Sequence, residues 1–519
     1  MSSRRAPCWP GHHASDPTEL AGGLASRRGA WLSGNMFRRV ITVALLACAT
    51  AAGAQTAAVT QTDLRRHIDV LASDRFEGRL PGTAGERLTT DYLVRELTAR
   101  GLEPAGVDGT WFQPVTLVER GRANQQVTWS GPRGRIAVPP DTLVLTGRDA
   151  AARIPSAPVI FVGLRSGGGE IAGANLRGAV VLASYEAPVG GAVSSFAERT
   201  QALTQAGAAA VIGIVSRDLP FGRVRAASAR QSLRLEQDLL PPIFGAMSWD
   251  GATALFRGAG VDLAAAERSG AVRALPIRAD IRLANSVRRF TTNNVVGRIR
   301  GRAATGQNVV LLGHWDHLGL CRPERAEDRI CNGAVDNASG MAVLIEAAGR
   351  IAAGPRPARD VLVLATTAEE MGLFGAEAFA RTPTVARASI VAAVNVDTSA
   401  VAPAGTPIAV IGGTPALKAM VRQVVEQAGL RFDPDSEADV MAQRQDGWAL
   451  SRNGIPALMA STNASDMNRL RAYLGSTYHG PDDEPSTPIE LGGAVDDANL
   501  LVQLARAFGD PARWPGAAR

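Results

Sequence analysis

The stretch 308–316 reads Asn-Val-Val-Leu-Leu-Gly-His-Trp-Asp and is an apolar run that ends in the imidazole of His314 and the carboxylate of Asp316. Two later apolar runs also precede acidic residues: 361–365 comes before Glu369-Glu370, and 390–394 comes before Asp397. Such runs, separated by helical patterns, predict buried strands of a mixed, largely parallel sheet flanked by helices, an α/β fold. Because ligands bind beyond the carboxyl ends of such strands, we expect these side chains to share one crevice.

A further acidic residue, Asp336, lies between the first two predicted strands. It is followed by Asn-Ala-Ser-Gly and then by apolar residues at helical spacing from Met341 to Ile351. Asn337 or Ser339 could cap this helix, which would place Asp336 beside the positive end of the helix dipole. We therefore expect the carboxylate of Asp336 to be ionised, as a metal ligand must be.

These segments and a later histidine, His479, offer the ligand types of a catalytic metal site. Imidazole nitrogen and carboxylate oxygen suit hard divalent ions, and a two-metal site, roughly 3.5–4 Å across, also needs one carboxylate that bridges both ions. The chain has only six His, at positions 12, 13, 67, 314, 317 and 479, so half of the total lies in these motifs. His317 is interpreted as a polar loop residue without a role.

Several motifs in this order resemble those of the M28 family of zinc metallopeptidases, over about residues 290 to 510. They are His314-Trp-Asp-His-Leu-Gly319, Asn332-Gly-Ala-Val-Asp-Asn-Ala-Ser-Gly340, Ala368-Glu-Glu-Met-Gly-Leu373, Asn395-Val-Asp397 and Tyr478-His-Gly-Pro-Asp482. Upstream, residues 71–86 are similar to the N-terminal segment of bacterial aminopeptidases of that family. Val335 and Thr398 depart from the commonest family residues, and neither change removes a ligand.

The resemblance implies two bound divalent metal ions, zinc above all, and a role for each residue. His314 and Asp397 would hold one ion, Glu370 and His479 the other, and Asp336 would bridge them. Asp316 would orient the ring of His314, and Glu369 would be the general base that takes a proton from the attacking water. The loop 444–448 resembles the family only in part and makes Asp446 and Trp448 candidate pocket residues, although Trp448 could equally be core.

The segment 130–275 has a different pattern, with strand-like runs at 159–163, 178–183 and 209–214 and a helical stretch at 196–206. It resembles a protease-associated (PA) domain, and a plain β-rich insertion is the alternative. The expected organisation is a leader at 1–54, the first part of the catalytic domain at 55–129, the PA-like insert at 130–275 and the main catalytic part, a zinc exopeptidase-like (phosphorylase/hydrolase-like) domain, at 276–512.

The N-terminal region predicts export to the periplasm or out of the cell. Charged residues from Met36 are followed by the short apolar run 40–47 and by Ala52-Gly-Ala54, the pattern of a cleaved signal peptide that is too short to span a bilayer. Met36 could also be the true start of translation. The competing interpretation is a lipoprotein, because 45–48 resembles a lipobox and Cys48 could carry a lipid anchor.

The cysteines and charged residues of the chain indicate its compartment and exclude some classes of binding protein. Cys321 and Cys331 are the only cysteines after the leader and could form a disulfide in an oxidising compartment, with two further zinc ligands as the alternative. Lys418 is the only lysine, so the chain has no phosphate-binding Gly-Lys-Ser/Thr loop. The formal net charge is +6 with no sustained basic run, and we expect no nucleic-acid partner.

The favoured hypothesis is an exported dizinc aminopeptidase that hydrolyses N-terminal residues from peptides. Two other classes remain open: a single-zinc acyltransferase of the glutaminyl cyclase type, and a non-catalytic receptor-like binding protein on the same scaffold. The first is disfavoured by a full ligand set for two metals. The second is disfavoured because proteins of that kind lose ligands, whereas every expected ligand and Glu369 are present here.

Overall fold

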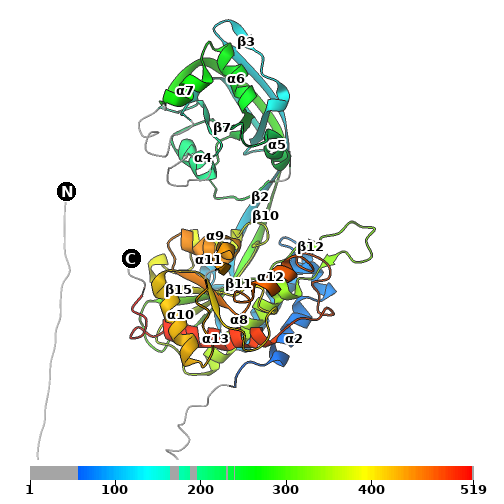
Figure 1. The fold of residues 1–519 in the computed structure, drawn as a ribbon, viewed down its shortest axis with the longest axis vertical. Helices are drawn as coiled ribbons and strands as arrows, with labels where there is room; N and C mark the ends of the chain where they lie inside the picture. Colours follow the sequence, from blue (N-terminus) through cyan, green and yellow to red (C-terminus); the bar gives the residue numbers. More distant parts are fainter. Residues whose placement is uncertain are drawn as a thin grey trace, which may run out of the picture. The chain divides into compact units, whose positions relative to one another are not determined.

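A computed structural model describes residues 57–163, 175–186, 196–229, 232–238, 240–269, 271–435 and 437–516. The signal segment, the possible start at Met36 and the lipid-anchor candidate Cys48 lie outside these residues. The helices and strands that carry the candidate site are grouped around one mixed sheet with helices on both of its faces (Figure 1). No helix among the described residues is long and apolar enough to cross a membrane.

The central sheet contains the predicted parallel strands. Its order is β16–β17–β15–β11–β14–β10, in which β11 pairs in parallel with both β14 and β15, and β15 with β17, while β16 and β10 run antiparallel to their neighbours. The strands are β10 (Arg273–Ile299), β11 (Asn308–His314), β14 (Asp360–Thr366), β15 (Ile390–Asn395), β16 (Ala409–Gly412) and β17 (Ala457–Ser461). The expectation of a mixed, largely parallel sheet is confirmed.

Helices cover both faces of this sheet because successive side chains of each strand point to opposite sides. Val309 and Leu311 of β11 lie in one hydrophobic cluster, and Val310 and Leu312 lie in another. The first face is covered by α2 (Gln61–Leu71), α3 (Ala84–Ala99), α8 (Gly340–Ala353), α10 (Pro415–Gln427) and α13 (Gly492–Phe508). The second is covered by α9 (Phe374–Arg381) and α11 (Asp446–Arg452). The parallel strands β11, β14, β15 and β17 are therefore buried on both faces, as in other parallel sheets.

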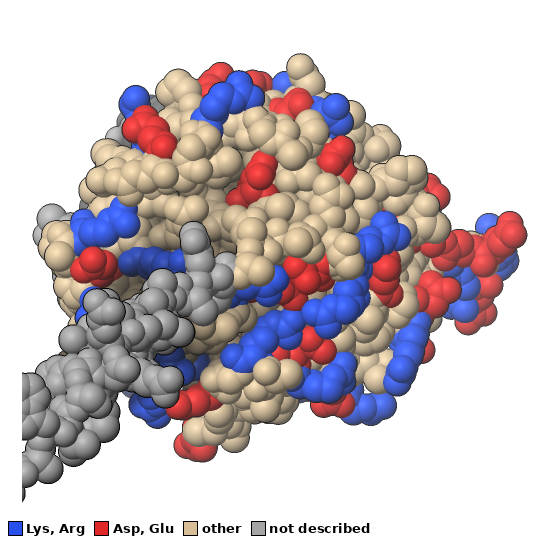
Figure 2. Space-filling model, turned by 90° about the horizontal axis from the view of Figure 1, so that it is seen from below, with Lys and Arg blue, Asp and Glu red and all other residues tan. Residues whose placement is uncertain are grey.

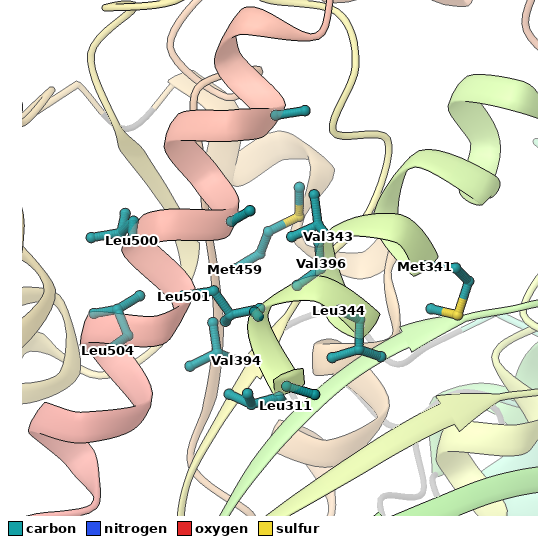
Figure 3. Packing of buried hydrophobic residues seen from close by; sticks show 14 of the residues in the cluster. Leu311, Met341, Val343, Leu344, Val394, Val396, Met459, Leu500, Leu501 and Leu504 are labelled. Carbon is teal, nitrogen blue, oxygen red and sulfur yellow. The ribbon is translucent and has the colours of Figure 1, made fainter. Parts of the chain in front are cut away.

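Figure 3 shows the first face from close by. Leu344 of α8 and Leu501 of α13 lie beside Leu311 and Val394, which come from neighbouring strands of the sheet. All of these side chains are at most 1% exposed except Leu501, at 3%. This packing gives the loops at the strand ends a rigid base.

The long strands β2 (Phe112–Gly131) and β10 pair antiparallel from Phe112–Val295 to Ser130–Arg278. Between them the chain forms β3 (Gly134–Ile136), β4 (Leu143–Gly147), β5 (Ala151–Phe161), β6 (Val180–Ser184), β7 (Ala210–Val215), β8 (Ser232–Leu235) and β9 (Ile243–Ser248), with helices α4 (Phe196–Gln205), α5 (Phe221–Ala229), α6 (Trp249–Gly258) and α7 (Leu263–Ser269). β5, β6, β7 and β9 are parallel and share a hydrophobic cluster of their own. That this segment is a PA domain stays a prediction.

Charged side chains of both signs are mixed on the surface. On the face seen in Figure 2, arginines lie beside acidic residues. Exposed ion pairs of this kind include Arg65–Asp69 at 2.7 Å and Arg422–Glu426 at 2.8 Å. Such a distribution is typical of a solvated surface.

Candidate metal centre

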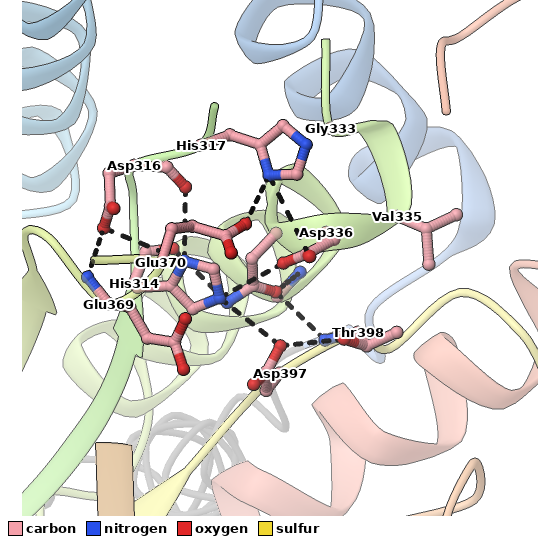
Figure 4. Close-up of polar contacts among 12 residues, drawn as sticks. His314, Asp316, His317, Gly333, Val335, Asp336, Glu369, Glu370, Asp397 and Thr398 are labelled. Atoms are coloured by element: carbon pink, nitrogen blue, oxygen red, sulfur yellow. Dashed lines mark hydrogen bonds and ion pairs between the residues drawn. The ribbon is translucent and has the colours of Figure 1, made fainter. Parts of the chain in front are cut away.

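The candidate ligands lie at the carboxyl ends of the central strands. His314 is the last residue of β11, Glu369 and Glu370 follow β14 after a short loop, and Asp397 follows β15 by two residues. Since β14 and β15 both pair in parallel with β11, their ends meet at the same edge of the sheet. Figure 4 shows these side chains pointing toward one another.

Asp336 reaches the same point from the loop before α8. The side chain of Asn337 accepts hydrogen bonds from Gly340 N at 3.0 Å and from Thr398 N at 3.1 Å. Asn337 thus caps the N-terminus of α8 and also ties this loop to the end of β15. Ser339, the other candidate cap, donates its hydroxyl to Val335 O at 2.7 Å instead.

The first group of candidate ligands consists of His314, Asp336 and Asp397. Nε2 of His314 lies 3.3 Å from Oδ1 of Asp336 and 3.5 Å from Oδ1 of Asp397. Ligand atoms that bind one ion at about 2.0–2.2 Å in tetrahedral geometry are separated by roughly 3.3 Å. The three atoms therefore have the spacing of a shared metal ion.

The second group contains Asp336 again, with Glu370 and two histidines. Nε2 of His479 lies 3.3 Å from Oδ2 of Asp336 and 2.9 Å from Oε2 of Glu370. Asp336 therefore presents one carboxylate oxygen to each group, as a bridging ligand requires. Nδ1 of His317 lies 2.6 Å from the other oxygen of Glu370, Oε1, and 3.9 Å from Oδ2 of Asp336.

His317 is the residue that sequence reasoning missed. It was interpreted as a polar loop residue, whereas its side chain is fully buried and contacts a candidate ligand. The scarcity of histidine could have indicated this residue: after residue 54 the sequence has only four histidines, and three of them, His314, His317 and His479, lie here. The fourth, His67, is buried elsewhere, against Tyr92 and Glu346.

Asp316 makes different contacts from those expected. Nδ1 of His314 lies 3.2 Å from the main-chain oxygen of Asp316 and 3.9 Å from its carboxylate. The carboxylate instead accepts a hydrogen bond from Glu369 N at 3.0 Å. The ring of His314 thus faces the main-chain carbonyl of Asp316, and the carboxylate of Asp316 fixes the backbone of Glu369. That Asp316 orients the ring of His314 stays a prediction.

The electrostatics of the group reflect many carboxylates in a buried space. Burial raises the pKa of Asp316 to about 7 and that of Glu369 well above its usual range. Burial alone would lower the pKa of His314, but the neighbouring Glu369, Asp336 and Asp397 raise it well above its usual range. Burial would also raise the pKa values of Asp336 and Glu370, but hydrogen bonds from the neighbouring histidines lower the pKa of both carboxyl groups.

The donor set fits a divalent cation. Glu370 Oε1 and His479 Nε2 are buried atoms without a hydrogen-bond partner of good geometry, although each lies close to other candidate ligands. Two groups among the described residues have ligand atoms within 4.8 Å of one another: His314, Asp336 and Asp397, and His317, Asp336 and Glu370. Nitrogen and carboxylate oxygen are ligands that zinc accepts. These residues could therefore hold metal.

A cavity with apolar walls opens on the first group. His314, Asp336, Glu369 and Asp397 form its polar end, and its apolar wall consists of Ile411, Met441, Met459, Leu470 and Leu474. Tyr478 also lines it and stacks on the ring of His479, with centroids 3.6 Å apart. A cavity of this composition suits a substrate with one apolar group beside a reacting polar one.

The predicted pocket residues Asp446 and Trp448 do not line this cavity, whereas their neighbours Arg444 and Gln445 do. The reason is that α11 begins at Asp446 and turns its carboxylate inward, where it accepts a hydrogen bond from the hydroxyl of Thr366. Asp446 is 1% exposed. The pocket assignment is therefore corrected to Arg444 and Gln445.

Cys321 and Cys331 form a disulfide that closes a loop beside the centre. The bridge joins the two-stranded sheet of β12 (Gly319–Leu320) and β13 (Ile330–Cys331). Sγ of Cys331 lies 3.4 Å from the main-chain oxygen of His479. The disulfide thus supports the loop that carries one candidate ligand.

An α/β domain whose strand ends gather histidines and carboxylates around a cavity defines a candidate metallohydrolase. Residues 294–504 match the model of peptidase family M28. A comparison with curated proteins finds no match.

Solved structures similar to this chain include an aminopeptidase from Aneurinibacillus sp. strain AM-1, with 18% identity and a TM-score of 0.43, covering 85% of this chain and 92% of that one. BSAP, a zinc aminopeptidase from Bacillus subtilis, shares 15% identity at a TM-score of 0.41, with 85% and 93% covered. A peptidase M28 precursor from Shewanella amazonensis SB2B shares 18% identity at a TM-score of 0.41, with 86% and 96% covered.

Proposed function

We propose that the protein is an aminopeptidase that holds two divalent metal ions, zinc above all, and removes N-terminal residues from peptides. The observation that carries the proposal is the position of Asp336, whose two carboxylate oxygens each lie 3.3 Å from a different histidine, His314 and His479. A carboxylate placed between two ligand groups is the feature that a two-ion centre needs and a one-ion centre does not. The match of residues 294–504 to the model of a peptidase family supports peptides as substrates.

Each side chain then has a defined task. His314 and Asp397 would hold one ion, Glu370 and His479 the other, and Asp336 would contact both. When bound, the ions would lower the pKa of a water molecule and polarise the peptide carbonyl. Glu369 lines the cavity and would take the proton of the attacking water and deliver it to the leaving amine. The main-chain N of Glu369 donates a hydrogen bond to the carboxylate of Asp316, which fixes the backbone of Glu369.

The cavity supports an exopeptidase that begins at the amino end. The substrate's first side chain would lie against the apolar wall formed by Met441, Met459 and Leu470, next to the reacting group. Its free ammonium group would then be within reach of the carboxylates of Glu369 and Asp397, which line the same cavity.

The test compares two substrates that differ only at the amino end, leucine p-nitroanilide and N-acetyl-leucine p-nitroanilide. We expect turnover of the free amine, loss of turnover when a chelator removes metal, recovery with zinc, and no cleavage of the acetylated compound. Rapid internal cleavage of N-blocked peptides would overturn the aminopeptidase assignment. Cyclisation of N-terminal glutamine with one ion per chain would favour the acyltransferase, and metal binding without any turnover would favour the binding protein.

We also propose that the protein is exported. The pattern of residues 36–54 supports a cleaved signal peptide, and the disulfide between Cys321 and Cys331 supports an oxidising compartment. The mass of the mature protein from its host separates the two routes. Cleavage after Ala54 gives a soluble chain that begins at Gln55, whereas a lipid-modified chain would begin at Cys48.

A further inference from the structure

A short segment outside the family match lies against the candidate metal centre. The helical turn η2 (Asp74–Arg79) ends in Arg79, whose side chain is fully buried. A buried guanidinium without a carboxylate partner loses its hydration and must satisfy its donors within the protein. Every hydrogen bond that the guanidinium of Arg79 donates goes to a main-chain oxygen, and none goes to a carboxylate.

The acceptors of Arg79 belong to the loops that carry candidate ligands. Its Nε donates to Trp315 O at 2.8 Å, directly after His314 in the sequence. One terminal nitrogen donates to Asn332 O at 2.5 Å and to Leu71 O at 2.9 Å, and the other to Gly333 O at 2.9 Å and Asp336 O at 3.4 Å. A single planar group therefore connects the residue after His314 with the backbone of Asp336.

The backbone of this segment is held in a costly conformation. Glu77, Gly78 and Arg79 all have positive φ, at 47°, 62° and 52°. For residues other than glycine this region is unfavourable and persists only where surrounding contacts enforce it. Gly78 is required for a second reason, because a Cβ there would lie 2.3 Å from Cys331 O. The turn thus packs closely against the loop closed by the disulfide, and the side chain of Arg79 points toward the candidate metal centre.

We propose that Arg79 is a positioning residue of the metal centre: its guanidinium joins the main chain at Trp315 to that at Gly333 and Asp336, and so sets the separation of His314 and Asp336. This proposal rests on the function proposed above. The main-chain oxygen of Arg79 adds a further link, since it accepts a hydrogen bond from His317 N at 3.4 Å. The segment at 74–79 is then part of the site, although it lies far from the ligands in sequence.

The charge of Arg79 separates this role from a purely electrostatic one. Burial lowers its pKa to about 10, so the side chain remains a cation at neutral pH. A cation near a metal site repels the incoming ion, so removal of charge alone would tighten metal binding. Weaker binding in a variant that keeps the charge therefore marks a loss of geometry.

The chain offers a matched control in Arg359. This arginine is 1% exposed and also donates to main-chain oxygens, of Phe508 at 2.7 Å and Trp514 at 2.6 Å. Its Nε also donates to Oε1 of Gln307 at 2.8 Å, and none of its acceptor residues is a candidate ligand. Arg359→Lys and Arg79→Lys are thus the same chemical change in two buried sites, of which one touches the centre.

The experiment measures zinc binding to metal-free full-length protein by calorimetry, together with the unfolding temperature of each variant. We expect Arg79→Lys to weaken zinc binding by roughly 10- to 100-fold, the effect of losing a group that orients ligands. Arg359→Lys should lower the unfolding temperature and leave zinc affinity within about twofold of wild type. Unchanged affinity in Arg79→Lys, or an equal loss in both variants, would overturn the proposal.

If Arg79→Lys does not fold, Asp74→Ala decides the question. Oδ1 of Asp74 accepts a hydrogen bond from Asn332 Nδ2 at 2.9 Å, so this exposed residue ties the same segment to the same loop. A several-fold loss of zinc affinity supports the proposal, and unchanged affinity overturns it. A wild-type chain that binds no zinc at all would instead refute the proposed function on which the inference depends.

Discussion

Nδ1 of His317 lies 2.6 Å from Oε1 of Glu370, while the other oxygen of Glu370 faces His479 at 2.9 Å. Both side chains of the His317–Glu370 pair are at most 5% exposed. The carboxylate of Glu370 is therefore held from both sides. Because Oε2 has the spacing of a metal ligand and Oε1 contacts His317, we expect His317 to fix the orientation of Glu370.

Replacing His317 by alanine should weaken the binding of the second zinc ion by roughly tenfold, because Glu370 becomes free to rotate. Calorimetric titration of the metal-free protein measures this affinity. His67→Ala is the control, since His67 is also fully buried and contacts a carboxylate, Glu346, through Nε2 at 2.8 Å, but is not part of the centre. His317→Ala with wild-type affinity for both ions would show that the contact has no role in binding.

Variants of Glu369 and Glu370 should distinguish a residue that acts in the reaction from one that binds metal. Glu369→Gln is nearly isosteric, and we expect both ions to be retained while the rate of anilide hydrolysis falls by roughly 10²–10⁴, the usual contribution of a general base. Glu370→Gln should instead lose one ion. Elemental analysis and initial rates of the two variants measure both effects. Retained activity in Glu369→Gln, or loss of metal from it, would contradict the assignment.

The disulfide between Cys321 and Cys331 should contribute to stability. It closes a loop with a sequence separation of 10, for which the loss of chain entropy in the unfolded state corresponds to about 2–3 kcal/mol. We expect the double replacement of both cysteines by alanine to lower the free energy of unfolding by this amount, as measured by urea denaturation. An unchanged urea midpoint would mean that the loop is already ordered without the bridge.

The stability of the α2–α3–α8 region should depend on pH through Glu346. Burial alone would raise its pKa, but hydrogen bonds from His67 and Arg100 lower it from 4.5 to about 2. Glu346 thus stabilises the folded state fully above pH 4.5, and this contribution is lost as the pH falls toward 2.

We expect Glu346→Gln to unfold more easily than wild type at pH 7, by roughly 2 kcal/mol, and the difference to shrink at pH 3. Urea denaturation at both pH values, with chelator present, measures it. Asp69→Asn is the control because Asp69 forms an exposed pair with Arg65. A difference between wild type and Glu346→Gln that stays constant with pH would refute the account.

The features that could be predicted from the sequence are those encoded locally. The apolar runs before His314, Glu369 and Asp397 correspond to β11, β14 and β15, because strands buried on both faces need uninterrupted aliphatic residues. The helix after Asp336 begins at Gly340, whose main-chain N donates a hydrogen bond to the side chain of Asn337. Because β14 and β15 pair in parallel with β11, the residues that follow these three strands lie at the same edge of the sheet.

The remaining features depend on contacts between distant segments. Arg79 contacts Trp315 and Asp336, which lie 236 and 257 residues further along the chain, and no local pattern distinguishes it from a solvated arginine. The contact of Nδ1 of His317 with Glu370 likewise follows only from the tertiary fold. Asp446 was placed in the pocket because the direction of a side chain at a helix start is not visible in sequence.

The central claim is that Asp336 joins two ion sites, and the number of zinc ions bound per chain tests it most directly. Metal-free protein is titrated with zinc by calorimetry, with elemental analysis of the dialysed product, for wild type and for Asp336→Ala. We predict two ions per chain in wild type, with activity restored, and loss of both in the variant, because each group of ligands shares this carboxylate. One ion per chain in the active wild type, or two ions retained by Asp336→Ala, would contradict the claim.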